Sequence, residues 1–282
     1  MRKHGTTILL FLILLIGLSL MLYPSFSDWW NSMHQSRAIA AYSEQVAQLD
    51  TDRYGQIWED ARAYNQSLLY RENSFLLSDE QKAEYERLLD VSGMGIMGYI
   101  EIPEINCSLP IYHGTEESVL QIAVGHIEWS SLPVGGESSH CVISGHRGLP
   151  SAKLFTNLDK LTEGDTFMLR VLDEVLTYEV DQILIVEPQE TEPLRIEEGK
   201  DYCTLVTCTP YGINSHRLLV RGHRIDNVEE ADAVRITADV IQIEPLLVAP
   251  FAALPLLAVL LVILLALPQK PKSHGGDDHE AE

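Results

Sequence analysis

Hydrophobic and polar positions follow three successive patterns along the chain. An uncharged apolar run extends from Thr6 to Tyr23. From about Met33 to Leu69, apolar residues recur at steps of three and four, which predicts helices. From Gly98 onward the period becomes two, which predicts strands. The chain is therefore expected to begin with helices and to continue as a β domain.

The helical region divides into three predicted helices. Two apolar faces support the first pair: Ile39, Tyr42, Val46 and Leu49, followed by Ile57, Ala61, Tyr64 and Leu68. Gly55 is expected to separate these two helices. A third helix is predicted at Ser78–Leu89, because Ser78 and Gln81 have the spacing of a capping box. The loop before it, residues 70–77, carries the aromatic residue Phe75.

Segments with period two predict seven or eight short strands. They are expected near residues 99–103, 109–112, 141–144, 166–172, 175–186, 202–208 and 217–224. A short helix is expected at Ser118–Gly125, and Asp173-Glu174 is expected to turn a hairpin. Many short strands with turn residues and few helices favour a mainly β fold, a small barrel.

Two apolar segments are long enough to cross a membrane. Thr6–Tyr23 has 18 residues and Pro245–Pro268 has 24, and a hydrocarbon core of about 30 Å needs roughly 20 helical residues. A cleaved signal peptide is the alternative for the first segment, but the sequence after it lacks a small-x-small cleavage site. Prolines inside the second segment are tolerated in membrane helices. Both segments are therefore predicted to be transmembrane helices.

Basic residues flank these two segments on their outer ends. Arg2 and Lys3 precede the first, and Lys270 and Lys272 follow the second. Because basic flanks remain in the cytoplasm, both termini are expected there and residues 24–244 outside. The formal charge of −21 falls entirely on residues 24–246, which hold sixteen basic and 37 acidic residues. Such a surface repels phosphate backbones, so nucleic acid is not expected as a partner, whereas cationic partners are compatible with it.

Four cysteines occur, at positions 107, 141, 203 and 208. Two disulfides are conceivable in an exported domain, but Cys203 and Cys208 would face opposite sides of one strand. Cys141 and Cys203 could approach each other if their strands are neighbours in register. Small buried core residues are the more ordinary interpretation. No close cysteine pair suggests a zinc site, and no metal or cofactor is expected.

The candidate chemistry lies at strand ends. Cys208 ends a strand just before Thr209-Pro210, and Arg217 begins the next strand across a hairpin. His146, between glycines in Gly145-His146-Arg147-Gly148, ends another strand. A thiol becomes a strong nucleophile as the thiolate, which nearby cations stabilise. His216 is an alternative to Arg217, since adjacent residues face opposite sides of a strand and periodicity does not choose between them.

The run from Met97 to Arg224 resembles a sortase of class C, the pilin-polymerising class. The resemblance is carried by three segments: Ser144-Gly145-His146-Arg147-Gly148, Thr204-Leu205-Val206-Thr207-Cys208-Thr209-Pro210 and Asn214-Ser215-His216-Arg217-Leu218-Leu219-Val220-Arg221-Gly222. The helical N-terminal extension and the second apolar segment also match class C.

The resemblance implies an eight-stranded sortase barrel on a Gram-positive cell surface. It implies Cys208 as nucleophile, His146 as general acid/base and Arg217 as stabiliser of the tetrahedral intermediate. The substrate would be a Leu-Pro-x-Thr-Gly-like sorting signal, cleaved between Thr and Gly and joined to a pilin lysine. Two alternatives remain: a sortase that anchors proteins to peptidoglycan, and a non-catalytic membrane-anchored scaffold.

The expected organisation has seven segments. They are a cytoplasmic N-terminus (1–5), a membrane anchor (6–23), an extracellular helical extension (24–95), the catalytic barrel (96–228), a linker (229–244), a second membrane helix (245–268) and a cytoplasmic tail (269–282).

One feature departs from the class C pattern. Class C sortases commonly carry an Asp-Pro-aromatic lid over the cysteine, and this chain contains no Asp-Pro. The loop in the corresponding place offers Asn73-Ser74-Phe75. Phe75 is therefore a candidate for the aromatic plug, with simple packing at the helix junction as the alternative. A lid without the acidic residue is expected to be weaker or more mobile.

Overall fold

The computed structural model describes residues 5–71 and 75–227. The predicted second membrane helix, the linker before it and the tail after it lie outside the described residues, as do Asn73 and Ser74 of the loop that precedes Phe75.

Four α-helices are described: α1 (Gly5–Ala47), α2 (Thr51–Leu68), α3 (Asp79–Arg87) and the short α4 (Glu117–Leu120). Short 3₁₀ helices lie at η2 (Pro103–Ile105), η3 (Leu158–Lys160) and η4 (Glu192–Leu194). The predicted anchor and the first predicted helix are parts of one continuous helix, α1, which contains Pro24. Within the described residues, α1 is the single helix long and apolar enough to cross a membrane, and an 18-residue stretch of it has a mean hydropathy of 2.4. The chain divides at Pro24 into an apolar N-terminal unit and the larger unit that follows.

The break between the first two helices does not lie at Gly55, which is inside α2. It lies at residues 48–50, where the Asp50 carboxylate accepts a hydrogen bond of 2.8 Å from the backbone N–H of Arg53. A side-chain cap satisfies a free N–H of the new helix, whereas a glycine inside a helix only reduces its stability. The cap therefore fixes the boundary. The capping box predicted at Ser78 and Gln81 is confirmed at the start of α3.

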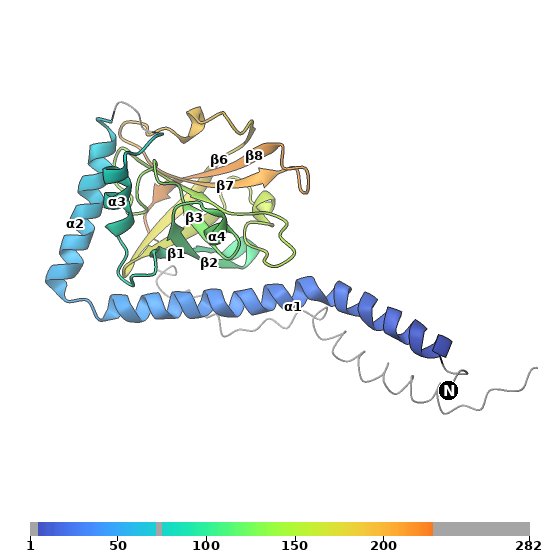
Figure 1. The fold of residues 1–282 in the computed structure, drawn as a ribbon. Helices are drawn as coiled ribbons and strands as arrows, with labels where there is room; N and C mark the ends of the chain where they lie inside the picture. Colours follow the sequence, from blue (N-terminus) through green and yellow to red (C-terminus); the bar gives the residue numbers. More distant parts are fainter. Residues whose placement is uncertain (1–4, 72–74, 228–282) are drawn as a thin grey trace, which may run out of the picture. The chain divides into compact units, whose positions relative to one another are not determined.

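In the described residues, eight strands form a closed barrel in the order β1-β2-β3-β4-β7-β8-β6-β5. This confirms the predicted eight-stranded barrel with its N-terminal helical extension, and Figure 1 shows the helices beside the strands. Their bounds are β1 (Ile96–Ile102), β2 (Cys107–His113), β3 (Val124–His126), β4 (Ser139–Ser144), β5 (Thr166–Val171), β6 (Glu174–Val186), β7 (Asp201–Thr209) and β8 (His216–Ile225).

Two local predictions were wrong. The predicted helix at Ser118–Gly125 ends at Leu120, and Val124–His126 forms β3, which pairs in parallel with β2 and antiparallel with β4. Hydrogen bonds to two strands outweigh the local helical pattern there. The predicted turn at Asp173-Glu174 is one residue late, because Glu174 already belongs to β6 and Leu172 adopts a positive φ of 54°.

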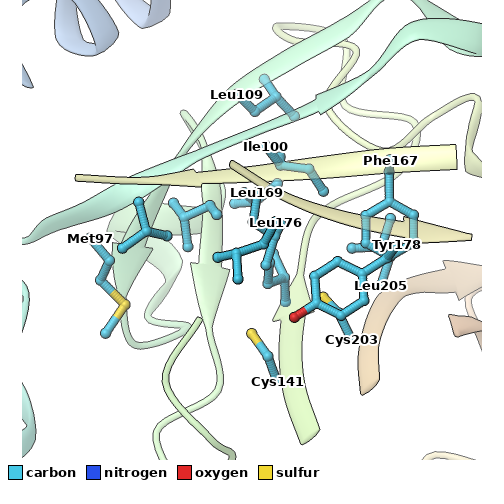
Figure 2. Close-up of a cluster of buried hydrophobic side chains, with 14 of the residues drawn as sticks. Met97, Ile100, Leu109, Cys141, Phe167, Leu169, Leu176, Tyr178, Cys203 and Leu205 are labelled. Carbon is cyan, nitrogen blue, oxygen red and sulfur yellow. The ribbon is translucent and has the colours of Figure 1, made fainter. Parts of the chain in front are cut away.

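The core fills the barrel interior with alternate residues of each strand. Figure 2 shows Cys141 and Cys203 there, among the side chains of Leu176, Tyr178 and Leu205. Cys141 and Cys203 are register partners on the parallel strands β4 and β7, so these two cysteines do lie on neighbouring positions, as reduced thiols.

Buried polar side chains fix the helices against the barrel. The Tyr42 hydroxyl of α1 donates to the Met97 carbonyl (2.9 Å) and accepts from the Leu172 N–H (2.8 Å). Asn65 of α2 exchanges two hydrogen bonds with the backbone of Leu132. A buried donor or acceptor without a hydrogen-bond partner lowers the stability of the fold. These contacts therefore define one docking position for the helices.

Candidate active site

The hairpin of β7 and β8 places a thiol directly opposite a guanidinium. Cys208 and Arg217 are cross-strand partners, and Thr209 pairs with His216. Residues directly opposite each other project to the same face of a sheet, so Arg217, and not His216, accompanies Cys208. Leu218, its neighbour on β8, packs in the barrel interior. Cys208 and Arg217 therefore lie on the outer face of the barrel.

A second strand brings His146 to the same end of the sheet. β4 and β7 are parallel, with Ser144 opposite Val206. Two hydrogen bonds extend this pairing beyond the strand: the Gly145 N–H donates to the Val206 carbonyl (3.0 Å), and the Thr207 hydroxyl donates to the Gly145 carbonyl (2.8 Å). The two strands leave the sheet in the same direction, and His146 lies two residues beyond β4, at the end of the sheet where Cys208 is the last residue but one of β7.

Close packing defines the backbone on either side of His146. A Cβ at Gly145 would lie 2.7 Å from the Phe155 ring and 2.9 Å from Val124. Gly148 has a φ of +76°, and the Tyr211 ring lies against it. Only glycine fits both places. The Tyr211 ring also lies beneath the Arg147 guanidinium, so the loop after β4 contacts the loop between β7 and β8.

The two arginines on this face of β8 have different surroundings. The Arg217 guanidinium donates to the backbone carbonyls of Asn214 (3.3 Å) and His216 (3.1 Å), and no carboxylate of the described residues forms an ion pair with it. Arg221 makes two 3.0 Å hydrogen bonds to Asp181. A planar guanidinium with unpaired donors is suited to stabilise an oxyanion. Arg217 has this freedom and Arg221 does not.

The four thiols differ in burial and in pKa. Cys107, Cys141 and Cys203 are buried, and Cys208 is partly exposed. Burial raises the pKa of Cys107 to about 12. Burial and the adjacent Cys141 raise the pKa of Cys203 well above its usual value. Cys208 is therefore the thiol that is accessible for chemistry.

Comparison with known proteins agrees with this geometry. Residues 100–225 match the sortase domain. Crystal structures of sortase C1 from Streptococcus agalactiae and sortase C from Streptococcus pneumoniae are each 49% identical and cover 68% of this chain. Their TM-scores are 0.67 and 0.62, over 100% and 97% of the solved chains. Sortase D of Bacillus subtilis is 33% identical over 131 residues, which are 45% of this chain and 63% of that protein.

The chain belongs to the sortase family. Its similarity to the two streptococcal sortase C structures extends beyond the barrel domain, since the matched share of the chain exceeds residues 100–225. The predicted membership of class C is thereby supported.

In this sortase, an apolar strip continues from the cysteine along the outer face of the sheet. It consists of five buried residues with three partly buried neighbours: Val142, Val186, Leu194, Val206 and Leu219, with Ile127, Trp129 and Leu184. Sequence reasoning did not identify this strip. The available signal was the set of apolar residues on the same strand faces as Cys208 and Arg217.

The lid candidate contacts this strip. The Phe75 and Trp129 rings meet edge to face with centroids 4.9 Å apart, and Phe75 is 39% exposed. Phe75 is therefore placed on the outer face of the barrel by an aromatic contact, a geometry worth about 0.5–1.5 kcal/mol in aromatic pairs.

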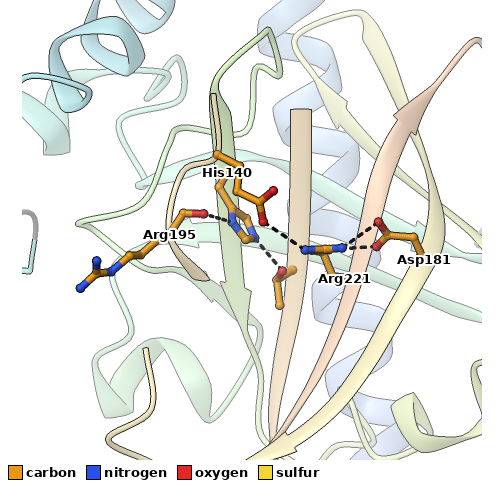
Figure 3. A network of polar contacts seen from close by, with 6 residues as sticks. His140, Asp181, Arg195 and Arg221 are labelled. Atoms are coloured by element: carbon orange, nitrogen blue, oxygen red, sulfur yellow. Dashed lines mark hydrogen bonds and ion pairs between the residues drawn. The ribbon is translucent and has the colours of Figure 1, made fainter. Parts of the chain in front are cut away.

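A polar network holds the segment between β6 and β7 against the same face (Figure 3). The His140 Nδ1–H donates to the Arg195 carbonyl (2.8 Å), and Nε2 accepts from the Thr204 hydroxyl (2.7 Å). Burial lowers the pKa of His140, so the ring is held in its neutral form. Arg221 pairs with Asp181 and, at 3.5 Å, with Glu197 of the same segment. This segment carries Leu194 to the apolar strip.

Proposed function

We propose that this sortase is a cysteine transpeptidase that polymerises pilins. It cleaves a Leu-Pro-x-Thr-Gly-like sorting signal between Thr and Gly and transfers the acyl group to a pilin lysine. The observation that supports this most directly is the pairing of Cys208 with Arg217 at the end of the sheet where β4 delivers His146. The similarity to the sortase C of Streptococcus pneumoniae, whose crystal structure bears on pilin substrate specificity, supports the substrate class.

In the first half of the reaction, the Cys208 thiolate attacks the threonine carbonyl carbon. The oxygen becomes an oxyanion, to which the Arg217 guanidinium donates hydrogen bonds. When the tetrahedral intermediate collapses, the carbon–nitrogen bond breaks and His146, as general acid, gives its proton to the leaving glycine amine. A thioester between threonine and Cys208 remains.

In the second half, the pilin lysine amine attacks the thioester carbon and loses a proton to His146. The carbon–sulfur bond breaks, Cys208 leaves as thiolate, and an isopeptide bond remains between the two pilins. A thioester is well suited to aminolysis because nucleophilic catalysis divides one difficult acyl transfer into two easier ones. Water must be excluded for aminolysis to exceed hydrolysis.

Phe75 is the part of the proposal that concerns access to the site. Its contact with Trp129 lies on the apolar strip that a sorting signal would have to occupy. We propose that Phe75 covers this strip in the resting enzyme and is displaced by substrate. The sequence lacks the acidic residue that usually accompanies such a lid, so the Phe75–Trp129 contact is the part of the closure that the described residues support.

The proposed membrane arrangement has two spans with both termini in the cytoplasm. The apolar N-terminal helix supports the first span, and the apolar sequence of residues 245–268 with its basic flank supports the second. Protease treatment of intact cells should remove epitope tags inserted in the exterior domain and leave tags at both ends intact. Loss of the C-terminal tag would contradict the two-span arrangement.

A reconstitution experiment tests the proposed activity. The full chain in lipid nanodiscs is incubated with a purified pilin that ends in a sorting signal. A ladder of covalent polymers, with an isopeptide bond found by mass spectrometry, is the expected result. Cleaved monomer alone, or transfer only to peptidoglycan fragments, would contradict pilin polymerisation. The same ladder from the Cys208→Ala variant would contradict the assigned nucleophile.

A further inference from the structure

The imidazole of His146 has a carboxylate neighbour that the mechanism above does not use. Nε2 of His146 lies 3.5 Å from Oε2 of Glu117, which is in α4. In the described part of the chain, this is the single ion pair that His146 forms. The contact follows from the fold, because β3, which comes just after α4, is antiparallel to β4 and pairs Gly125 with Ser144.

Glu117 is itself held in place. The Gln121 side-chain amide donates to Oε1, so the second oxygen, Oε2, is left for His146. The hydrogen bond from Gln121, together with the charge and hydrogen bond of His146, lowers the pKa of Glu117, and the carboxylate is therefore ionised at neutral pH. The chain just after α4 is tied to α1 by a 2.7 Å hydrogen bond from the Gln35 side chain to the Ile122 carbonyl.

A histidine that exchanges protons needs one defined tautomer. In a neutral imidazole, one nitrogen carries the proton and the other is the base, and a partner of one nitrogen decides which. A carboxylate only accepts hydrogen bonds, so Glu117 requires the proton on Nε2. Nδ1 is then left as the basic nitrogen.

We propose that Glu117 is a positioning residue, which holds His146 in the Nε2-protonated tautomer and leaves Nδ1 to exchange the proton with Cys208 and the leaving amine. Glu117 does not itself take up the proton. It accepts the same Nε2–H bond when the ring is neutral and when the ring is an imidazolium. This inference rests on the proposed role of His146 as general acid/base.

The test uses the full chain in nanodiscs with ¹⁵N-labelled histidine. Ring ¹⁵N shifts distinguish the two tautomers, and the His146 signals are those lost in His146→Asn. The neutral His146 ring of the unsubstituted chain should show the Nε2-protonated form. Glu117→Ala should show a mixture of tautomers, and kcat should fall about 10-fold with KM for the sorting peptide unchanged, a part of the ~10²–10⁴-fold that general acid–base catalysis contributes.

Matched variants separate a positioning role from a general effect of charge. Glu117→Gln keeps an acceptor oxygen without the charge and should restore the tautomer and most of kcat. Glu116→Gln removes the same charge one residue earlier, where the carboxylate pairs with Lys82 at 3.7 Å, and should change neither. Gln121→Ala loosens the carboxylate without altering it, and should cause a smaller change in the same direction.

An unaltered tautomer in Glu117→Ala, or an altered tautomer with unchanged kcat, would overturn the inference. Failure of the proposed function would be seen separately, as transpeptidation that survives His146→Ala. The ¹⁵N measurement does not depend on turnover, so the two failures are distinguishable.

Discussion

Two cysteines on one strand of this barrel have opposite surroundings. Cys203 and Cys208 are five positions apart on β7, and the pleat sends them to opposite faces. Cys203 is fully buried in the barrel beside Cys141, and its pKa is raised. Cys208 is partly exposed on the outer face and opposite Arg217. The strand thus carries one thiol that is packed in the core and one that is accessible to other molecules.

The same contrast is seen along the outer face of β8. Arg221 and Arg217 are four positions apart and share a face, but Arg221 is engaged by Asp181 and by the Tyr202 ring, 4.1 Å from its guanidinium carbon. Arg217 is bonded to backbone carbonyls alone among the described residues. Side-chain partners therefore occupy the guanidinium in the middle of the strand, whereas the guanidinium at the end of the sheet keeps donors available for a ligand.

The largest effect is expected from exchanging Cys208, the proposed nucleophile. Cys208→Ser should reduce kcat by at least ~10³-fold, because loss of a nucleophile leaves only the contributions of binding and of the oxyanion donors. Cys203→Ser should retain turnover per folded molecule and lower the melting temperature, since it buries a hydroxyl in an apolar interior. Transpeptidation rates and thermal unfolding measure the two effects.

Iodoacetamide labelling at pH 8 provides the control. Burial makes the three interior thiols inaccessible, and the raised pKa values of Cys107 and Cys203 also keep those two protonated, so one label should be found, on Cys208. Labelling of Cys203 in the folded protein would contradict the comparison.

The arginine comparison predicts the next largest effect. Arg217→Ala should lower kcat about 10²–10³-fold, the usual loss when one oxyanion donor is removed. Arg217→Lys should recover little of it, because an ammonium cannot reproduce the planar fork. Arg221→Lys should instead reduce stability with a small change in kcat. Equal losses of kcat at the two positions would contradict a role in catalysis that Arg217 has and Arg221 lacks.

A substitution at Thr207 tests how the interior side of β7 affects the position of His146. Thr207 is buried on the interior side of β7, next to Cys208, and its hydroxyl reaches the Gly145 carbonyl. Thr207→Val should lower the free energy of unfolding by about 1–3 kcal/mol, because it leaves a buried acceptor unpaired, and should reduce kcat by displacing His146. Thr207→Ser keeps the hydroxyl and should behave like the parent enzyme in denaturant titration and in kinetics. A Thr207→Val variant of unchanged kcat would show that His146 is positioned without this bond.

The smallest expected effect concerns Phe75, which is proposed to cover the apolar strip on the outer face of the barrel. Phe75→Ala removes an edge-to-face contact worth about 0.5–1.5 kcal/mol, which corresponds to roughly a 2- to 10-fold larger open population. The rate of Cys208 alkylation should rise by that factor. Leu76→Ala, at the exposed neighbouring position, should leave it unchanged. An unchanged rate in Phe75→Ala would refute the lid.

Much of the site could be predicted because it depends on local pattern. The hairpin spacing placed Cys208 opposite Arg217, and strand alternation separated Cys208 from Cys203. The seven period-two segments correspond to seven of the eight strands, and the eighth, β3, was expected to be mostly helical. The choice of Arg217 over His216 needed the family resemblance, and cross-strand pairing confirms that Arg217 shares the face of Cys208.

What could not be predicted depends on contacts distant in sequence. Val124 and Gly125 lie in the predicted helix Ser118–Gly125, but in the structure they belong to β3, which pairs with β2 and β4. That pairing also brings Glu117 to His146, so the carboxylate neighbour was invisible in the sequence. Gly55 was taken as a helix break because glycine is a weak helix former, whereas the Asp50 side chain sets the true boundary. The Trp129 contact of Phe75 likewise joins two loops far apart in the chain.

The pairing of β1 with β5 has a consequence for recognition of other chains. It gives every strand two neighbours, so the described sheet presents no open edge to which an extended peptide could add as another strand. A partner chain must therefore be recognised by side chains of the outer face and the loops around it. Copies crowded together in one membrane likewise lack the edges through which sheets aggregate.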